Sequence, residues 1–416
     1  MAVIAPSSLV GARSPIYITA NYSSLASSLT DVQLEIFIWK GARNSKPNTA
    51  TYTLFRDVFA GQDVSFDVSK FVQEYITNTH TGFDPTDVSY VPDGSVYWVQ
   101  VDYNVSYYNK SDPPTISNDT GSTDIFEVSN GYHIFIEAAN KEVNKGFASV
   151  NAVKYIKDSG NEVVPVYLGK WGEGYDIYWA YKDRVLADGG TVEGGAQCAN
   201  IGLDVVEVLG DGGYNVEIRI TESELQGLQA EERLMLLPCG VTNLTEWLDS
   251  VGEPLVYTSY YDINLKDKDG TTLDTRRFYP TCEPKYTPLQ IQFINKNGVW
   301  ESVTFFKSSQ EQLQTRTSEY RRSIGSSGAT GFSYDTEQEQ YKRFNTNYRN
   351  SIRVNTGWVG EDYNEMMTQL LASERVLLDS KPVNVSTGSL QLQKHITNKT
   401  INYTIDLQYA YDTIYE

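Results

Sequence analysis

The stretch LQIQFINKNGVWESVTFFKS, residues 289–308, constrains the fold more than any other part of this sequence. Apolar residues alternate with polar ones on both sides of Asn297 and Gly298, as in two antiparallel strands joined by a tight turn. Asn-Gly is a preferred pair for a two-residue type I′ turn, because both central residues need positive φ. Trp300 and Phe306 supply apolar side chains to the second face. The stretch therefore predicts a hairpin covered on both faces, inside a β-sandwich or barrel.

The first part of the chain repeats this alternation in short runs, which predicts an N-terminal β-sandwich over residues 1–140. The clearest runs are PIYITANY, DVQLEIFIWK, TYTLFRDV, DVSFDVS, SVYWVQVDYNVSYY and YHIFIEA. One short helix is expected at DVSKFVQEYITN, where Asp67 is placed to cap its start. The polar segment of residues 109–124 is expected to be a loop that extends into solvent.

Two further domains are expected after the sandwich. Residues 141–255 contain shorter apolar runs separated by glycine-rich links, which predicts a middle β-rich domain. Residues 256–416 form the predicted C-terminal β domain, which opens with a hairpin around Asp269 and Gly270. The predicted fold class is therefore mainly β, a multi-domain sandwich or barrel architecture with a few short helices.

One amphipathic helix is expected in the C-terminal domain, over residues 361–378. Tyr363, Met366 and Leu370 recur on one face, which is the spacing of a helix that packs on a core. Asp362 and Glu365 have the spacing of a capping box at its start.

A long polar segment, residues 307–356, interrupts the C-terminal domain and has almost no aliphatic face. Loops longer than about 12–15 residues are uncommon unless they are functional or disordered, so this segment is predicted to be a flexible arm. Eight basic residues and five acidic ones lie between Lys307 and Arg353, whereas the whole chain has a net charge of −19. A basic arm on the acidic flank of a neighbouring subunit is one interpretation, and a solvated polar loop is the other. The candidate subunit-interface residues are Arg316, Arg321, Arg322, Lys342, Arg343, Arg349 and Arg353.

The sequence contains no recognisable catalytic or metal-binding motif. Its three histidines and three cysteines are isolated, without the paired spacing of a zinc site or a disulfide framework. The glycine-rich links lack the spacing of phosphate-binding loops. With 53 acidic residues many carboxylate pairs are available, but none is marked by its position. No enzymatic activity, cofactor or metal is therefore expected.

The charge and the absence of targeting signals narrow the classes of partner. The net charge of −19 argues against specific nucleic-acid binding, because phosphate affinity comes largely from Lys and Arg, although DNA passing nearby is compatible with it. The N-terminal residues MAVIAPSSLVGARSP lack the basic and apolar regions of a signal peptide, and no apolar stretch is long enough to span a bilayer. Neither secretion nor membrane insertion is expected.

Several pieces of the last 160 residues follow one another in a distinctive order. They are CEPKYTPLQIQFINKNGVWESVTFF, IRVNTGWVGEDYNEMMTQLLASERVLL, PVNV and TNKTINYTIDLQYAYD. In this order they resemble a family of virion structural proteins from tailed phages of Bacteroidetes, including crAss-like phages. Such proteins are tail or neck components, and no motif in the resemblance is catalytic. The first 250 residues share only their β character and the SPIYITA start.

The resemblance implies a virion subunit that is made in the bacterial host cytoplasm and placed in the tail or neck. Combined with the arm and the acidic bulk, it leads us to expect a non-enzymatic homo-oligomeric ring or tube. Its partners would be copies of itself and other tail, neck or portal-associated proteins. The alternative is a glycan-binding receptor-recognition or adhesin module, suggested by the aromatic residues of VYWVQVDY and GYDIYWAYKD, although aromatic residues in strands are also ordinary core.

Overall fold

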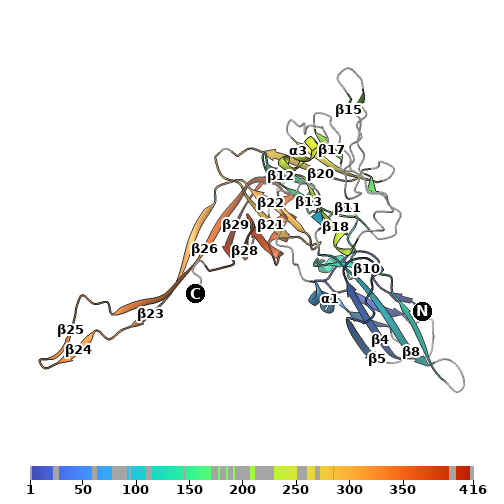
Figure 1. Ribbon diagram of the computed structural model, residues 1–416, viewed down its shortest axis with the longest axis horizontal. Helices are drawn as coiled ribbons and strands as arrows, with labels where there is room; N and C mark the ends of the chain where they lie inside the picture. Colours follow the sequence, from blue (N-terminus) through green and yellow to red (C-terminus); the bar gives the residue numbers. More distant parts are fainter. Residues whose placement is uncertain are drawn as a thin grey trace.

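The computed structural model describes residues 2–21, 28–58, 63–76, 91–92, 95–108, 115–144, 146–169, 177–178, 184–185, 191–192, 207–210, 229–250, 260–267, 272–283, 285–392 and 400–412. The chain is mainly β with several sheets and short helices, which confirms the predicted fold class. None of the sheets formed by the described residues closes into a barrel. Figure 1 shows an N-terminal sandwich, a central body, and a thin arm that leaves the body in another direction. Among the described helices, none is both long and apolar enough to span a membrane.

The N-terminal sandwich consists of two sheets that enclose one core. The smaller sheet has the order β1 (Ala2–Ile4), β3 (Tyr17–Asn21), β6 (Val64–Asp67). The larger has the order β2 (Val10–Gly11), β10 (Phe126–Ser129), β8 (Tyr97–Tyr108), β4 (Ser28–Trp39), β5 (Tyr52–Asp57), and β9 (Ile116–Ser122) also pairs with β8. Alternation along each strand turns residues such as Ile18, Leu34 and Val99 into the shared core.

The helix expected in the sandwich is present as α1 (Ser69–Tyr75). The Asp67 Oδ1 accepts hydrogen bonds from the backbone N–H groups of Ser69 at 3.0 Å and Ile16 at 3.2 Å, which fixes the entry to the helix. Val72 then packs into the sandwich core. The prediction that residues 109–124 form a loop in solvent is partly wrong, because Ile116–Ser122 forms β9 along the edge of β8.

The run YHIFIEA, predicted as a strand, forms no strand. It contains a single 3₁₀ turn, η1 (Phe135–Glu137), in which Phe135 is 100% and Ile136 86% exposed. Glu137 closes the turn by accepting the N–H of Ile134 at 3.0 Å. Just before this 3₁₀ turn, the backbone N–H of Tyr132 donates to the carbonyl of Lys296, which lies between β21 and β22, at 2.7 Å. No strand in the part of the chain that the structure describes pairs with this run, so apolar alternation alone does not make it a strand.

Two sheets form the middle of the body. One has the order β11 (Gly146–Phe147), β13 (Val163–Tyr167), β18 (Leu234–Pro238), β7 (Val91–Pro92). The other has the order β12 (Val153–Lys157), β20 (Thr272–Thr281), β19 (Tyr261–Asp267), β14 (Ile177–Tyr178), with β17 (Glu207–Gly210) also on β19. The short pair β15 (Arg184–Val185) and β16 (Thr191–Val192) and the helices η2 (Ala230–Glu232) and α3 (Val241–Ser250) complete this region.

The pairing of β12 with β20 joins segments on either side of residue 255, and the two strands run parallel. This sheet therefore crosses the boundary between the predicted middle and C-terminal domains. The strands β19 and β20 form the hairpin expected there, while its turn at Asp269 and Gly270 lies outside the described residues.

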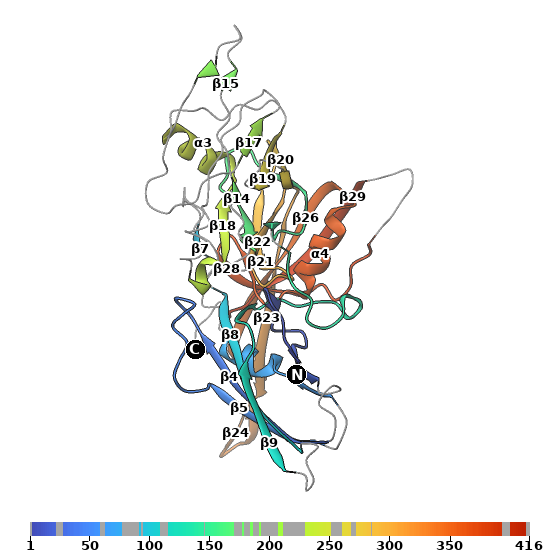
Figure 2. The same ribbon diagram turned by 90° about the vertical axis from the view of Figure 1, so that its right-hand side faces the viewer.

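The largest sheet has seven strands and carries the arm. Its order is β22 (Trp300–Phe305), β21 (Leu289–Ile294), β27 (Val376–Leu378), β28 (Lys381–Val385), β29 (Thr400–Tyr409), β26 (Tyr341–Gly360), β23 (Gln310–Arg321). Helix α4 (Tyr363–Ala372) covers one face of it (Figure 2). Met366 and Leu370 of the helix are buried in one core with Phe293 and Ile405 of the sheet.

The turn of the β21–β22 hairpin differs from the predicted two-residue type I′ turn. The Gly298 N–H donates to the Asn295 carbonyl at 3.0 Å, and the Asn295 N–H donates to the Val299 carbonyl at 3.0 Å. Gly298 has a φ of 79°, whereas Asn297 does not have the positive φ that type I′ needs. The side chain of Asn295 explains the longer turn, because its Oδ1 accepts the N–H of Asn297 at 2.9 Å.

The helix expected over residues 361–378 ends earlier, at Ala372. Ser373 is extended, and its hydroxyl oxygen accepts the N–H of Ile294 at 3.0 Å. This contact draws the following residues to the sheet edge, where Val376–Leu378 pair with β21 as β27. Pairing with a neighbouring strand therefore prevails over the apolar spacing that suggested a longer helix.

The predicted capping box at the start of α4 does not form. Asp362 makes no capping hydrogen bond with its side chain. Glu365 instead accepts a hydrogen bond from the Gln369 side chain at 2.8 Å, one turn further along the helix.

Candidate interaction surface on the arm

The segment predicted as a flexible loop is an ordered β-hairpin, which we call the arm and define as residues 310–350. The strands β23 and β26 pair from Gln310 with Arg353 to Arg321 with Tyr341. A second small hairpin, β24 (Gly325–Gly328) with β25 (Gly331–Tyr334), forms the far end (Figure 1). Backbone hydrogen bonds between the strands satisfy the polar groups that a structureless loop would leave open, so no apolar face is needed for this order.

Almost every residue of the arm faces solvent, including its large apolar side chains. The exposed ones are Leu313, Tyr320, Phe332, Tyr334, Tyr341 and Phe344, of which Phe332 is 71% exposed. The rings of Tyr320 and Phe344 meet edge to face at 5.6 Å. Lys342 lies opposite Tyr320 in the ladder, so a cation and two aromatic rings share one face. The sequence prediction named only the basic residues and missed Tyr320 and Phe344, because the spacing of the aromatic residues in β23 and β26 gives no regular strand pattern.

Two of the seven predicted interface residues lie at the base of the arm in ion pairs within the chain. Arg349 Nε contacts Asp412 Oδ1 at 2.7 Å. Arg353 contacts both carboxylate oxygens of Asp406, at 2.5 and 3.0 Å. The hydrogen bond from Arg353 lowers the pKa of Asp406. These two arginines fasten the arm to β29 and its C-terminal continuation.

The other five predicted residues, Arg316, Arg321, Arg322, Lys342 and Arg343, form no ion pair with any residue that the structure describes. The ladder places Arg343 opposite Glu319 and Arg321 opposite Tyr341. Four of the five therefore gather near the outer end of the β23–β26 ladder, and we call them, with Arg316, the basic band.

The basic excess counted in the sequence is not spread along the arm. Lys307 pairs with Glu283 at 2.5 Å, so three of the eight basic residues are neutralised near the base by acids outside it. Asp335, Glu337 and Glu339 lie between β25 of the end hairpin and the start of β26. The arm thus carries an acidic segment next to the basic band.

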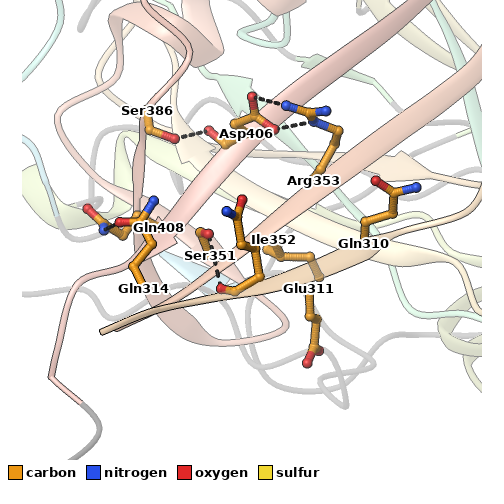
Figure 3. A pocket seen from close by; sticks show the side chains of 10 residues that line it. Gln310, Glu311, Gln314, Ser351, Ile352, Arg353, Ser386, Asp406 and Gln408 are labelled. Carbon is orange, nitrogen blue, oxygen red and sulfur yellow. Dashed lines mark hydrogen bonds and ion pairs between the residues drawn. The ribbon is translucent and has the colours of Figure 1, made fainter. Parts of the chain in front are cut away.

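A polar groove of about 500 Å³ lies at the base of the arm (Figure 3). Its lining residues are Gln310, Glu311, Gln312, Gln314, Ser351, Ile352, Arg353, Ser386, Asp406 and Gln408. A smaller hollow of about 200 Å³ adjoins it through Gln314 and Gln408, whose amides bond at 3.2 Å, and adds Tyr348. Amide, carboxylate and guanidinium groups suit a polar ligand held by hydrogen bonds. The lining contains no histidine, cysteine or lysine to act as an activated nucleophile or base.

The metal-ligating residue types are scattered in the part of the chain that the structure describes. No group of three or more His, Cys, Asp or Glu side chains there is placed to hold a metal ion. His133 is half-buried and accepts the N–H of Gly11 at 3.4 Å, and burial lowers its pKa. His80, His395 and Cys198 lie outside the described residues.

No protein-family model matches the chain, and no curated protein matches it. Among solved structures, a Ca²⁺-stabilised adhesin that helps an Antarctic bacterium reach out and bind ice covers 96% of this chain and 95% of its own. The sequence identity is 10% and the TM-score is 0.15. A likeness of this size carries no argument about fold or function, and the resemblance to phage tail and neck proteins stays a prediction.

Proposed function

We propose that this chain is a non-enzymatic structural subunit of a phage tail or neck that assembles into a homo-oligomeric ring or tube. The observation that supports this most is the arm, in which no residue is buried and most are exposed. A two-stranded hairpin alone is marginally stable in water. An arm of this length therefore gains stability from the surface of another molecule.

A second copy of the chain fits the chemistry of that surface. The arm offers a basic band, whereas the whole chain carries a net charge of −19. It also offers open backbone edges, because β23 ends the sheet and only Ser351–Gly360 of β26 pairs with β29. An open edge can add a strand from a neighbour. A contact between arm and body is heterologous, and such contacts close into rings when the rotation allows.

Removing the arm tests the proposal directly. Replacing residues 312–350 by a short Gly-Ser linker is expected to leave a folded monomer that no longer assembles, because the sandwich and the body both retain their own cores. Analytical ultracentrifugation reports assembly, and circular dichroism reports folding. Unchanged oligomers after the deletion would contradict the proposal.

A finer test reverses the charge of the basic band. The triple change Arg321→Glu, Lys342→Glu and Arg343→Glu is expected to weaken self-association at least about tenfold, since like charges then face each other. The monomer should keep its stability within about 0.5 kcal/mol, because all three side chains are exposed. The matched control is the triple change Arg56→Glu, Lys70→Glu and Lys141→Glu, which alters the net charge by the same amount at exposed residues outside the arm. An equal loss of association in the control would assign the effect to net charge alone.

The alternative proposal is glycan recognition. The aromatic residues that suggested it from the sequence support it less in the structure. Trp98 of VYWVQVDY is fully buried, and its Nε1 donates to the Gly41 carbonyl at 2.9 Å. Most of GYDIYWAYKD lies outside the described residues. The groove at the base of the arm remains a suitable place for a saccharide, since it combines side-chain amides with Tyr348. A glycan array of host capsular and surface sugars tests it, and binding that survives Gln312→Ala with Gln408→Ala would exclude the groove.

A further inference from the structure

A buried cluster of three polar side chains lies beneath the turn of the β21–β22 hairpin, apart from the arm. Lys154 is 3% exposed, and Asn295 and Glu301 are fully buried. Each carboxylate oxygen of Glu301 contacts one of the other two side chains. Oε1 contacts the Lys154 Nζ at 3.2 Å, and Oε2 accepts a hydrogen bond from the Asn295 Nδ2 at 2.9 Å.

Three separate elements bring these groups together. Lys154 belongs to β12, Glu301 to β22, and Asn295 opens the turn between β21 and β22. The Lys154 ammonium also donates to the Ser302 carbonyl at 3.3 Å, which holds the side chain against β22. The shared carboxylate places an amine and a primary amide on either side of one proton acceptor.

The carbonyl of the Asn295 side chain is held by backbone donors. Its Oδ1 accepts the N–H of Asn297 at 2.9 Å and the N–H of Val299 at 3.4 Å. Two fixed N–H groups aimed at one carbonyl oxygen are the arrangement that stabilises the oxyanion in acyl transfer. The Asn295 Nδ2 also donates to the Ala148 carbonyl at 2.8 Å, so the whole amide is fixed in place.

We propose that Lys154 and Asn295 form an intramolecular isopeptide bond, with Glu301 carrying the protons. Glu301 takes a proton from the Lys154 ammonium, and the lone pair of the neutral amine attacks Cγ of Asn295. The N–H groups of Asn297 and Val299 hold the resulting oxyanion. Glu301 then delivers a proton to Nδ2 and receives one from Nζ, and the Cγ–Nδ2 bond breaks.

The products are an amide between Lys154 and Asn295 and one ammonia, which leaves as ammonium. The reaction therefore balances without an oxidant or another reactant. Burial favours it in two ways, since water that would hydrolyse the amide is excluded and the charged ammonium–carboxylate pair loses its hydration. Glu301 itself is oriented by the Val150 N–H, which lies 3.1 Å from each of its oxygens.

Lys154 starts as a protonated ammonium, so its loss of a proton to Glu301 is expected to be the slow step. Burial lowers the pKa of this amine, but Glu301, Glu162 and Cys239 together outweigh it, so the pKa is raised. The bond is therefore expected to form slowly after folding, in a single turnover. Once formed, it fastens β12 to the β21–β22 turn covalently.

Mass spectrometry of the purified full chain tests the proposal. The folded protein, incubated until its mass is constant, is expected to be lighter than its sequence by the mass of one ammonia. A protease digest should contain one branched peptide that joins Lys154 to Asn295. Glu301→Gln, which keeps the size of the side chain but removes the proton acceptor, should retain the full sequence mass. Asn295→Asp should lose water instead of ammonia and reach the same final mass as the natural chain.

Two results would overturn the proposal. One is a folded chain that keeps its full sequence mass throughout the incubation. The other is a loss of ammonia without a branched peptide, which is the outcome of a cyclic imide at an Asn-Gly pair, either Asn297-Gly298 or Asn130-Gly131. Both results are measured on the natural chain, so they test the proposal even if a variant does not fold.

Discussion

Replacing Arg233 by methionine is expected to lower the free energy of unfolding by about 3–5 kcal/mol near neutral pH. The Arg233 Nε contacts Glu127 Oε1 at 3.0 Å, and both side chains are almost completely buried. The Tyr167 hydroxyl donates to the other Glu127 oxygen at 3.3 Å. Glu127 belongs to β10 of the sandwich, whereas Arg233 and Tyr167 belong to the body. The change therefore leaves a buried carboxylate without its cation where the two parts meet.

The size of this loss is expected to depend on pH. In the natural chain burial raises the pKa of Glu127 while Arg233 opposes the rise. Without the guanidinium the folded-state pKa rises further above the unfolded value, so folding binds a proton. Stability then falls as pH rises, and the loss at about pH 5 should be smaller than at about pH 7.

Urea unfolding of the natural chain and Arg233→Met at both pH values measures this dependence. The double variant Glu127→Gln with Arg233→Met removes the uncompensated charge and should recover part of the loss. An equal loss at both pH values, unrelieved in the double variant, would show that packing of the Arg233 side chain is responsible instead.

Gly298→Val is expected to cost about 2–4 kcal/mol and to loosen the sandwich from the body. Gly298 has a φ of 79°, and a Cβ there would lie 2.4 Å from the Gly131 nitrogen. The obstacle is backbone, which cannot move aside cheaply. The turn also holds the sandwich through the Ser129 hydroxyl, which donates to the Asn297 carbonyl at 2.8 Å. The valine would therefore strain the turn and push the two parts away from each other.

Differential scanning calorimetry checks this expectation. In the variant, the sandwich should unfold in a separate transition, at a lower temperature than the body. Gly328→Val is the matched control, because a Cβ at Gly328 meets nothing within 4 Å. The control should unfold like the natural chain. A single transition of Gly298→Val at the natural temperature would contradict the predicted role of the close approach.

The sequence predicts well those strands whose side chains alternate against a core, such as β4 and β29, because period-two burial leaves its trace in residue type. It fails where order has another cause. The arm is ordered by pairing between exposed strands, so no apolar face announces it. Residues 132–138 alternate, but none of the described strands pairs with them, and α4 stops where Ser373 bonds to β21.

The candidate sites also divide into residues that the sequence indicates and contacts that only the tertiary structure shows. Basic residues of the arm could be named from the sequence, but only the register shows that Arg349 and Arg353 face acids of their own chain. Lys154, Asn295 and Glu301 were not singled out, because isolated polar residues are usually exposed and their mutual contacts depend on the tertiary fold.

The open edges of the arm also bear on how separate copies of the chain behave in solution. A long bare strand is a template on which identical strands can polymerise without limit. If an arm paired in parallel and in register with an identical arm, the two basic bands would lie side by side, and like charges across a ladder disfavour pairing. Fibre growth through arms stacked in this way is therefore expected to be disfavoured.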